Sequence, residues 1–174
     1  MKGLFEYISN RDINILRIIN NSWKCRFLDI IMPAMTYLGS FSFMFIFCTG
    51  AFLLSSSLLH VMAVKAMIAI TISTGIGKLL KISVTRLRPF IDIPNLNIKK
   101  IGIDKYSFPS GHTTGAFSLA VIIALYFPLF GFITIPLACC VGISRMYIGV
   151  HYPTDVIVGV FLGSICSILT YKFF

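Results

Sequence analysis

The chain has 174 residues, enough for one domain, which we take to be residues 1–174. It is 57% hydrophobic and only 12% charged, which excludes an ordinary soluble domain and indicates a membrane protein. The net charge of +9 would favour nucleic acid as the partner of a soluble protein. Beside long apolar segments it favours anionic lipid headgroups or a phosphorylated substrate, and we expect no nucleic acid partner.

Residues 1–40 form an N-terminal segment that we expect to be amphipathic and to lie at the membrane interface. Met1–Trp23 contains several charged side chains, which are costly inside hydrocarbon, and Asn10 is placed to cap a helix. Phe27–Leu38 is more apolar but contains Asp29, so we expect it to lie near the interface as well.

Five further apolar segments predict about five spanning helices and therefore an all-α, polytopic membrane bundle. A sixth span is possible if one N-terminal segment crosses the bilayer. In the last span Gly159 and Gly163 are four residues apart, which predicts a small-residue face for helix packing. The predicted spans are Phe41–Leu59, Val61–Leu80, Thr113–Phe127, Leu129–Ile143 and Thr154–Tyr171.

Counting the spans predicts where the polar segments between them lie. The second and fourth spans end on the side of the membrane where the third and fifth begin. Three polar segments should therefore converge on one membrane face. Their reactive side chains are Lys81, Arg88, His112, Arg145, His151 and Asp155.

His151 and Asp155 are the first candidates for catalysis. They are four residues apart, so on a helix they would lie on one face, where the carboxylate would fix the tautomer of the imidazole. We predict that His151 is a nucleophile oriented by Asp155. His112 has no neighbouring carboxylate in its segment, and we predict that it is the general acid for the leaving oxygen.

The remaining candidates would bind a phosphoryl group, which carries negative charge on three oxygens during transfer. Lys81, Arg88 and Arg145 would supply cations. The backbone N–H groups of Ser110 and Gly111, at the start of a helix, would add donors. No set of carboxylates remains for a divalent metal, so we predict metal-independent chemistry with no metal site and no cofactor.

Each segment taken alone also has a purely structural interpretation. Lys81, Arg86 and Arg88 could be interfacial anchors at a helix end, and Ser110-Gly111 a simple helix start. The polar connection 90–108 could line the entry to a site or be a solvated linker. The five cysteines follow no metal-binding spacing, and we interpret them as small buried hydrophobic residues.

Taken together, the three motifs resemble those of the type 2 phosphatidic acid phosphatase (PAP2) superfamily, which also includes vanadium haloperoxidases. The motifs occupy residues 81–155. They are Lys81 with six residues before Arg88-Pro89, then Pro109-Ser-Gly-His112, then Ser144-Arg145 with five residues before His151 and three before Asp155.

The resemblance implies an all-helical membrane fold and hydrolysis through a phosphohistidine on His151, with Asp155 orienting it and His112 as the acid. It matches Lys81, Arg88, Ser110, Gly111 and Arg145 to phosphate-binding positions and gives Ser144 no direct role. Small bacterial members make undecaprenyl diphosphate the favoured substrate. Phosphatidic acid, phosphatidylglycerophosphate and lipid A phosphates are alternatives.

Two other functions and two topologies remain open. A vanadate-dependent haloperoxidase could use the same anion site, although such enzymes are soluble, and a non-catalytic protein could bind anionic lipid with the same basic face. Under five spans, the positive-inside rule places the site in the cytoplasm. The resemblance instead implies a multi-pass protein of the cell membrane with an outward-facing site, which we expect. The oligomeric state stays open.

Overall fold

The computed structural model describes residues 2–54, 57–98 and 104–174, and all regular elements in these ranges are helices. One isolated bridge joins Leu87 and Tyr106. The predicted all-α fold is confirmed. The elements are α1 (Lys2–Arg17), the π-helical turn η1 (Ile18–Ser22), α2 (Arg26–Leu38), α3 (Phe41–Leu53), α4 (Ser57–Val84), α5 (Pro89–Asp92), α6 (Gly111–Tyr126), α7 (Pro128–Tyr147) and α8 (Pro153–Phe173).

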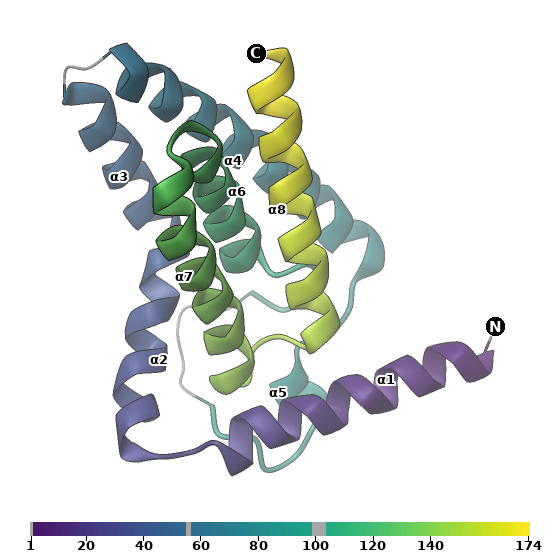
Figure 1. Ribbon diagram of the computed structural model, residues 1–174. Coiled ribbons are helices and arrows are strands. Elements are labelled where there is room, and N and C mark those ends of the chain that lie inside the picture. Colours follow the sequence, from purple (N-terminus) through teal and green to yellow (C-terminus); the bar gives the residue numbers. More distant parts are fainter. Residues whose placement is uncertain (1, 55–56, 99–103) are drawn as a thin grey trace.

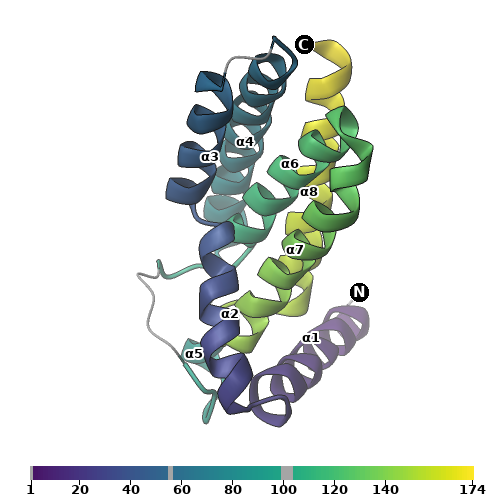
Figure 2. The same cartoon turned by 60° about the vertical axis from the view of Figure 1, so that its left-hand side comes forward.

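Helix α6 is the centre of the bundle. It packs against α4, α7 and α8, and ten of its 16 residues are buried (Figures 1 and 2). Gly159 and Gly163 of α8 make this packing possible, because a Cβ atom on either would crowd the backbone oxygens of Ser110 and Thr114 in the segment they face. The predicted small-residue packing face is therefore confirmed.

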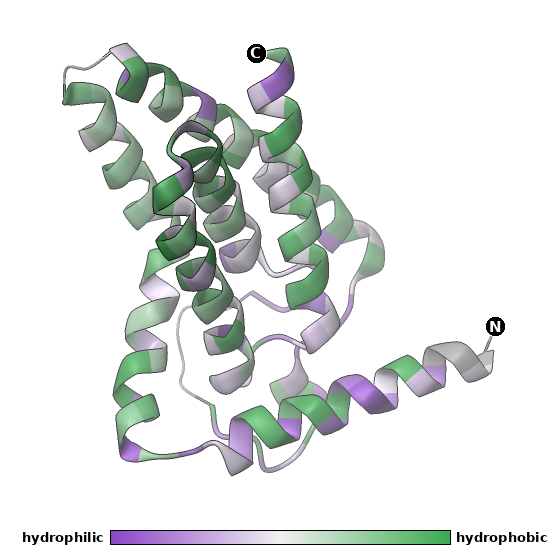
Figure 3. Cartoon of the chain, viewed as in Figure 1, coloured by the Kyte–Doolittle hydropathy of each residue, from purple (hydrophilic) through white to green (hydrophobic). Residues whose placement is uncertain are grey.

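The number of candidate spans is smaller than the sequence prediction. By length and composition α4, α7 and α8 could each cross a membrane, and α2 with α3 makes a fourth candidate bent by 55°. The predicted span Phe41–Leu59 is wrong, because α3 has 13 residues and reaches about 20 Å, less than the hydrocarbon thickness. Helix α6 is a shorter apolar helix inside the bundle, whose helices are mostly hydrophobic along their length (Figure 3).

The break between α2 and α3 lies at Gly39 and Ser40. A Cβ atom at Gly39 would lie 2.7 Å from the backbone oxygen of His112, so only glycine allows this close approach to the start of α6. Ser40 then caps α3 by accepting a hydrogen bond of 3.1 Å from the N–H of Phe43. The bend fixes α2 alongside the second half of α7.

Helix α1 lies across one end of the bundle (Figure 1). The predicted cap at Asn10 is wrong, because α1 begins at Lys2 and continues through Asn10. Asp12 is only 3% exposed and accepts a hydrogen bond of 3.1 Å from the N–H of Thr154 at the start of α8. The N-terminal charges therefore stay at this end of the bundle, and an N-terminal span does not carry them to the other side.

The predicted convergence of the three motifs is confirmed. The ends of α4 and α7 and the starts of α6 and α8 lie at the end of the bundle that α1 covers (Figure 1). The N–H of Ser110 donates a hydrogen bond of 3.0 Å to the backbone oxygen of Asp155, which ties the start of α6 directly to the start of α8.

Candidate active site

The segment after α4 carries two arginines into the site. Helix α4 ends at Val84, and Thr85 adopts a positive φ of 49°, which is strained for a β-branched residue and turns the chain sharply. The backbone then runs extended, and the N–H of Ser107 bonds to the Arg86 oxygen at 2.8 Å. Because side chains alternate along an extended chain, Arg86 and Arg88 lie on the same side of this segment.

His151 and Asp155 form the centre of the site, but not on one helical face. Helix α8 begins at Pro153, so His151 belongs to the preceding turn and Asp155 to the first turn of the helix. His151 Nδ1 lies 3.5 Å from Asp155 Oδ2, and the two residues are 2% and 0% exposed. The same Oδ2 accepts a hydrogen bond of 2.9 Å from the N–H of Tyr152, so the carboxylate caps α8 while it faces the imidazole.

Arg88 binds the opposite nitrogen of the same imidazole. Its Nη1 lies 3.2 Å from His151 Nε2 and donates to the Val150 oxygen at 3.0 Å. A guanidinium cannot accept a hydrogen bond, so the lone pair of Nε2 must point towards it, and the ring proton is on Nδ1 facing Asp155. Nε2 is therefore the nitrogen that faces Arg88.

The electrostatics of His151 keep it neutral near pH 7. Burial lowers the pKa of the His151 imidazole to about 4, and the charges of Arg145 and Arg88 act in the same direction. The Asp155 carboxylate, which faces the ring at 3.5 Å, opposes this shift. A neutral imidazole has one unprotonated nitrogen, so the site holds this ring in the form that a nucleophile requires.

Arg145, in the last turn of α7, is 3% exposed and held from a distant part of the sequence. Its Nη1 donates a hydrogen bond of 2.6 Å to Thr36 Oγ1 of α2. Its buried Nε has no hydrogen-bond partner in the described parts of the chain. A buried unsatisfied donor costs free energy, and an anion bound here would remove that cost.

Lys81 and Arg88 are joined by the carboxylate of Asp104, which pairs with both cations. Lys81 Nζ is 2.8 Å from Asp104 Oδ2, and Arg88 Nη2 pairs with Oδ1 of the same carboxylate. Partial burial alone would raise the pKa of Asp104, but the hydrogen bonds from Lys81 and Arg88 hold that pKa below its usual range. An exposed carboxylate thus neutralises two predicted phosphate-binding cations.

The second motif places His112 and the helix start beside these groups. His112 is half buried, and electrostatic interactions connect it with Arg145, His151 and Arg88. Ser110 caps α6, with its hydroxyl 2.8 Å from Thr113 Oγ1. Since the Ser110 N–H already bonds to Asp155, the expectation that it is free to bind phosphate is wrong for this structure, whereas Gly111 is exposed and nothing lies near its Cα hydrogens.

Several residues of the site were not identified from the sequence. Asp12 was assigned only to an interfacial helix and Arg86 only to a possible anchor, yet Arg86 contacts both Asp12 and Asp155. Asp104 was counted only as part of a polar loop. No local signal marks these residues, because their partners are distant in sequence. In the described ranges, no group of three or more His, Cys, Asp or Glu side chains is arranged to hold a metal ion.

The comparisons with known proteins agree with this geometry. The profile of the PAP2 superfamily matches residues 60–174, which is 115 of the 174 residues. The chain belongs to the PAP2 superfamily. It is 31% identical over 167 residues to the bacitracin transport permease protein BcrC of Bacillus licheniformis, covering 94% of this chain and 80% of that protein. It is 34% identical over 111 residues to an undecaprenyl-diphosphatase of Sulfolobus acidocaldarius, covering 62% of this chain and about half, 52%, of that protein.

Two crystal structures share the fold. LpxE of Aquifex aeolicus superposes with a TM-score of 0.83 at 30% identity, covering 92% of this chain and 94% of that one. The transmembrane PAP2-type phosphatidylglycerolphosphate phosphatase of Bacillus subtilis superposes with a TM-score of 0.75 at 26% identity, covering 96% and 86%. The chain is thus a multi-pass membrane protein and a lipid phosphatase of this superfamily.

Proposed function

We propose that this phosphatase removes the terminal phosphate of undecaprenyl diphosphate through a phosphohistidine on His151. One observation carries the mechanism: His151 Nε2 faces Arg88, beside a buried Arg145 whose Nε lacks a partner in the described parts of the chain. The relatives named undecaprenyl-diphosphatase support this substrate, while a relative named lipid A 1-phosphatase keeps lipid A phosphates as an alternative. Phosphatidic acid and phosphatidylglycerophosphate are further alternatives.

In the first step, His151 Nε2 attacks the terminal phosphorus. The N–P bond forms as the bond from phosphorus to the bridging oxygen breaks, and His112 donates its proton to that oxygen. The imidazole becomes positively charged, and Asp155 stabilises this charge through Nδ1–H. The lipid monophosphate leaves with the proton from His112.

In the second step, a water molecule attacks the phosphorus of the phosphohistidine. The O–P bond forms as the N–P bond breaks and its electron pair returns to His151 Nε2, and His112, now without its proton, accepts one from the water. Inorganic phosphate leaves, and His151 returns to its neutral form with the proton still on Nδ1. Neither step requires a metal ion, and metal-independent hydrolysis remains a prediction.

The cations stabilise the negative charge that spreads over the phosphoryl oxygens. Arg88 and Arg145 are each suited to binding two oxygens, and Lys81 acts as a point charge. The phosphate would replace the Asp104 carboxylate on Lys81 and Arg88 and satisfy the Arg145 Nε. The Gly111 backbone, at the start of α6, would add a donor.

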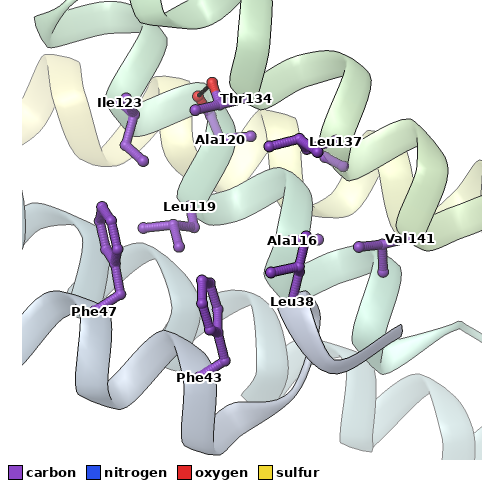
Figure 4. Close-up of a pocket in the computed structure, with 11 residues that line it drawn as sticks. Leu38, Phe43, Phe47, Ala116, Leu119, Ala120, Ile123, Thr134, Leu137 and Val141 are labelled. Carbon is purple, nitrogen blue, oxygen red and sulfur yellow. Dashed lines mark hydrogen bonds between the residues drawn. The ribbon is translucent and has the colours of Figure 1, made fainter. Parts of the chain in front are cut away.

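An apolar cavity beside the site supports a lipid substrate. It has a volume of about 140 Å³ and lies between α3, α6 and α7, where Phe43 and Phe47 face Leu119 and Ala116 (Figure 4). Its lining includes Val141, four residues and thus about one helical turn from Arg145. We propose that the first part of the lipid chain lies in this cavity while the phosphate binds at the end of the bundle.

Phosphate release distinguishes the substrates. Purified protein is given undecaprenyl diphosphate, lipid A, phosphatidic acid and phosphatidylglycerophosphate separately, with chelator present, and kcat/KM is compared. We expect release from undecaprenyl diphosphate at the highest kcat/KM. A higher value for another of the four would replace the substrate, and no release from any of them would remove the proposed activity.

For sidedness we propose an outward-facing site, as the family resemblance implies. The basic residues of α1 argue for the cytoplasmic side, because α1 is attached to the site end of the bundle. The prediction that all five cysteines are buried is wrong, because Cys25 and Cys139 are exposed, and Cys25 precedes α2 at this end. A variant that keeps only this cysteine should react with a membrane-impermeant maleimide in intact cells, and reaction only after lysis would place the site in the cytoplasm.

A further inference from the structure

The carboxylate of Asp155 is fixed from two directions. Its Oδ2 accepts 2.9 Å from the Tyr152 N–H and faces His151 Nδ1. Its Oδ1 accepts a hydrogen bond of 2.9 Å from Arg86 Nη1. Because the helix start holds one oxygen and Arg86 the other, Arg86 determines how the carboxylate is rotated towards the imidazole.

Arg86 is itself held tightly. Its Nη1 also donates to Thr154 Oγ1 at 2.7 Å, and its Nη2 donates to Asp12 Oδ2 at 2.7 Å. The guanidinium carbon lies 3.8 Å from the centre of the Tyr152 ring, within cation–π distance. Both terminal nitrogens of Arg86 are thus bound to carboxylates. In Arg88, by contrast, one terminal nitrogen faces the imidazole of His151 and only the other pairs with a carboxylate, that of Asp104.

Asp12 completes the network from the N-terminal helix. Its Oδ1 accepts from the Thr154 N–H at 3.1 Å, and its Oδ2 accepts from the Thr154 hydroxyl at 2.5 Å. A carboxylate that is 3% exposed would be strongly destabilising without such partners. Removing Arg86 would take the cation away from the buried Asp12 and Asp155 carboxylates, and removing Asp12 would take away one of the two carboxylates that hold Arg86 behind Asp155.

We propose that Arg86, held by Asp12 of α1, is a positioning residue that orients the Asp155 carboxylate towards His151. The inference rests on the proposed function, since it explains how the nucleophile of that reaction is held. Arg86 lies against Asp155 Oδ1, whereas Arg88, a proposed phosphate-binding cation, lies at His151 Nε2 on the other side of the pair. The N-terminal helix is then part of the catalytic framework and not only an interfacial anchor.

A positioning residue should affect kcat and not substrate binding. Loss of Arg86 lets the carboxylate rotate and weakens its stabilisation of the imidazolium, which we expect to lower kcat about tenfold to a hundredfold. The KM should change less than about twofold, because no phosphate contact is removed. A phosphate-binding arginine would instead raise KM.

The test is a double-mutant cycle on purified full-length protein. Arg86→Lys, Arg86→Ala and Asp12→Asn are each measured in the unmodified protein and in an Asp155→Asn background, with undecaprenyl diphosphate as substrate. We expect each substitution to lower kcat in the unmodified protein. In the Asp155→Asn background each should lower kcat by less than about twofold, because the carboxylate through which the substitution acts is already lost. Glu6→Gln, an exposed acidic residue on the same helix as Asp12, is the matched control and should change nothing.

The cavity behind Arg86 permits a second readout. A space of about 430 Å³ borders Asp12, Arg86 and Thr154. In Arg86→Ala, added guanidinium at millimolar concentration should enter this space and restore part of kcat, whereas in Arg86→Ala with Asp155→Asn it should not. Partial rescue also shows that the variant is folded.

The outcomes separate this inference from the proposed function. Hydrolysis by the unmodified protein, with equal losses in both backgrounds or with an increased KM as the main effect, would overturn the positioning role alone. Unchanged kcat in Arg86→Ala would do so as well. No hydrolysis of any of the four lipids by the unmodified protein would overturn the proposed function and this inference with it.

Discussion

The two sides of the His151–Asp155 pair use the same kind of ion pair in different surroundings. On the phosphate side, Lys81 and Arg88 share the carboxylate of Asp104, whose side chain is 57% exposed. On the rear side, Arg86 joins the carboxylates of Asp12 and Asp155, which are 3% and 0% exposed. Both sides therefore consist of basic groups paired with aspartates, and they differ mainly in how deeply the carboxylates are buried.

Burial decides which of these pairs a ligand can replace. An exposed ion pair contributes about 0–1 kcal/mol, because water competes well for both charges. Breaking a buried pair costs about 3–5 kcal/mol, because the remaining charge has no water. We therefore expect a substrate to replace Asp104 on the phosphate side, while the rear side stays assembled through the proposed reaction.

Removal of the nucleophile should give the largest effect. We expect His151→Ala to lower kcat by at least about 1,000-fold and to abolish labelling of the protein by a substrate carrying a radioactive terminal phosphate. His60→Ala is the control, because His60 packs against Phe52 at the far end of the bundle. Label retained in His151→Ala would show that another residue is the nucleophile.

Arg145 tests whether the phosphate side works by charge stabilisation. Arg145→Ala should lower kcat/KM by about 100- to 1,000-fold, because it removes a buried cation from the transition state. Arg145→Lys should restore only part of this loss, since lysine cannot bind two oxygens in one plane. Arg17→Ala, an exposed arginine in the last turn of α1, should leave kcat/KM unchanged. Full activity in Arg145→Lys would argue against bidentate binding.

The pH dependence tests whether His151 reacts as a neutral ring. The protonated ring cannot attack, and the pKa of His151 is lowered to about 4 by burial. The nucleophile therefore stays active as the pH falls from 7 to 5, and below about pH 4 the rate should fall about tenfold per unit. The rate of phosphoenzyme formation in a single turnover, measured as a function of pH, reports this acidic decrease directly. A decrease near pH 6.5 would mean that the ring is not shielded in the working enzyme.

The smallest effect should come from the replaceable carboxylate. Asp104→Asn removes the negative charge that competes with phosphate for Lys81 and Arg88, so KM should fall about twofold to fivefold with little change in kcat. Asp92→Asn, an exposed aspartate on α5, is the control. A loss of kcat in Asp104→Asn would mean that Asp104 assists the reaction and does not merely occupy the site.

Much of the phosphate side was predictable from the sequence. Its residues lie in three segments at the ends of apolar stretches, and the count of spans requires those segments to meet on one side. These residues are Lys81, Arg88, His112, Arg145, His151 and Asp155. The rear side was not predictable, because Asp12 and Thr154 are 142 residues apart in sequence. An aspartate on an amphipathic helix has the same local pattern whether it faces water or a buried arginine.

The sequence by itself determined the membrane class, the helical fold, the family and the end of the bundle at which the candidate site lies. These follow from apolar length and motif spacing, which act locally along the chain. Only the tertiary structure decided that α2 and α3 form one bent pair, that Thr36 holds Arg145, and that Arg86 links α1 to Asp155. Those contacts join residues that are distant in sequence, and they form because glycines and helix ends allow segments of the backbone to pack closely. A local sequence pattern does not contain that information.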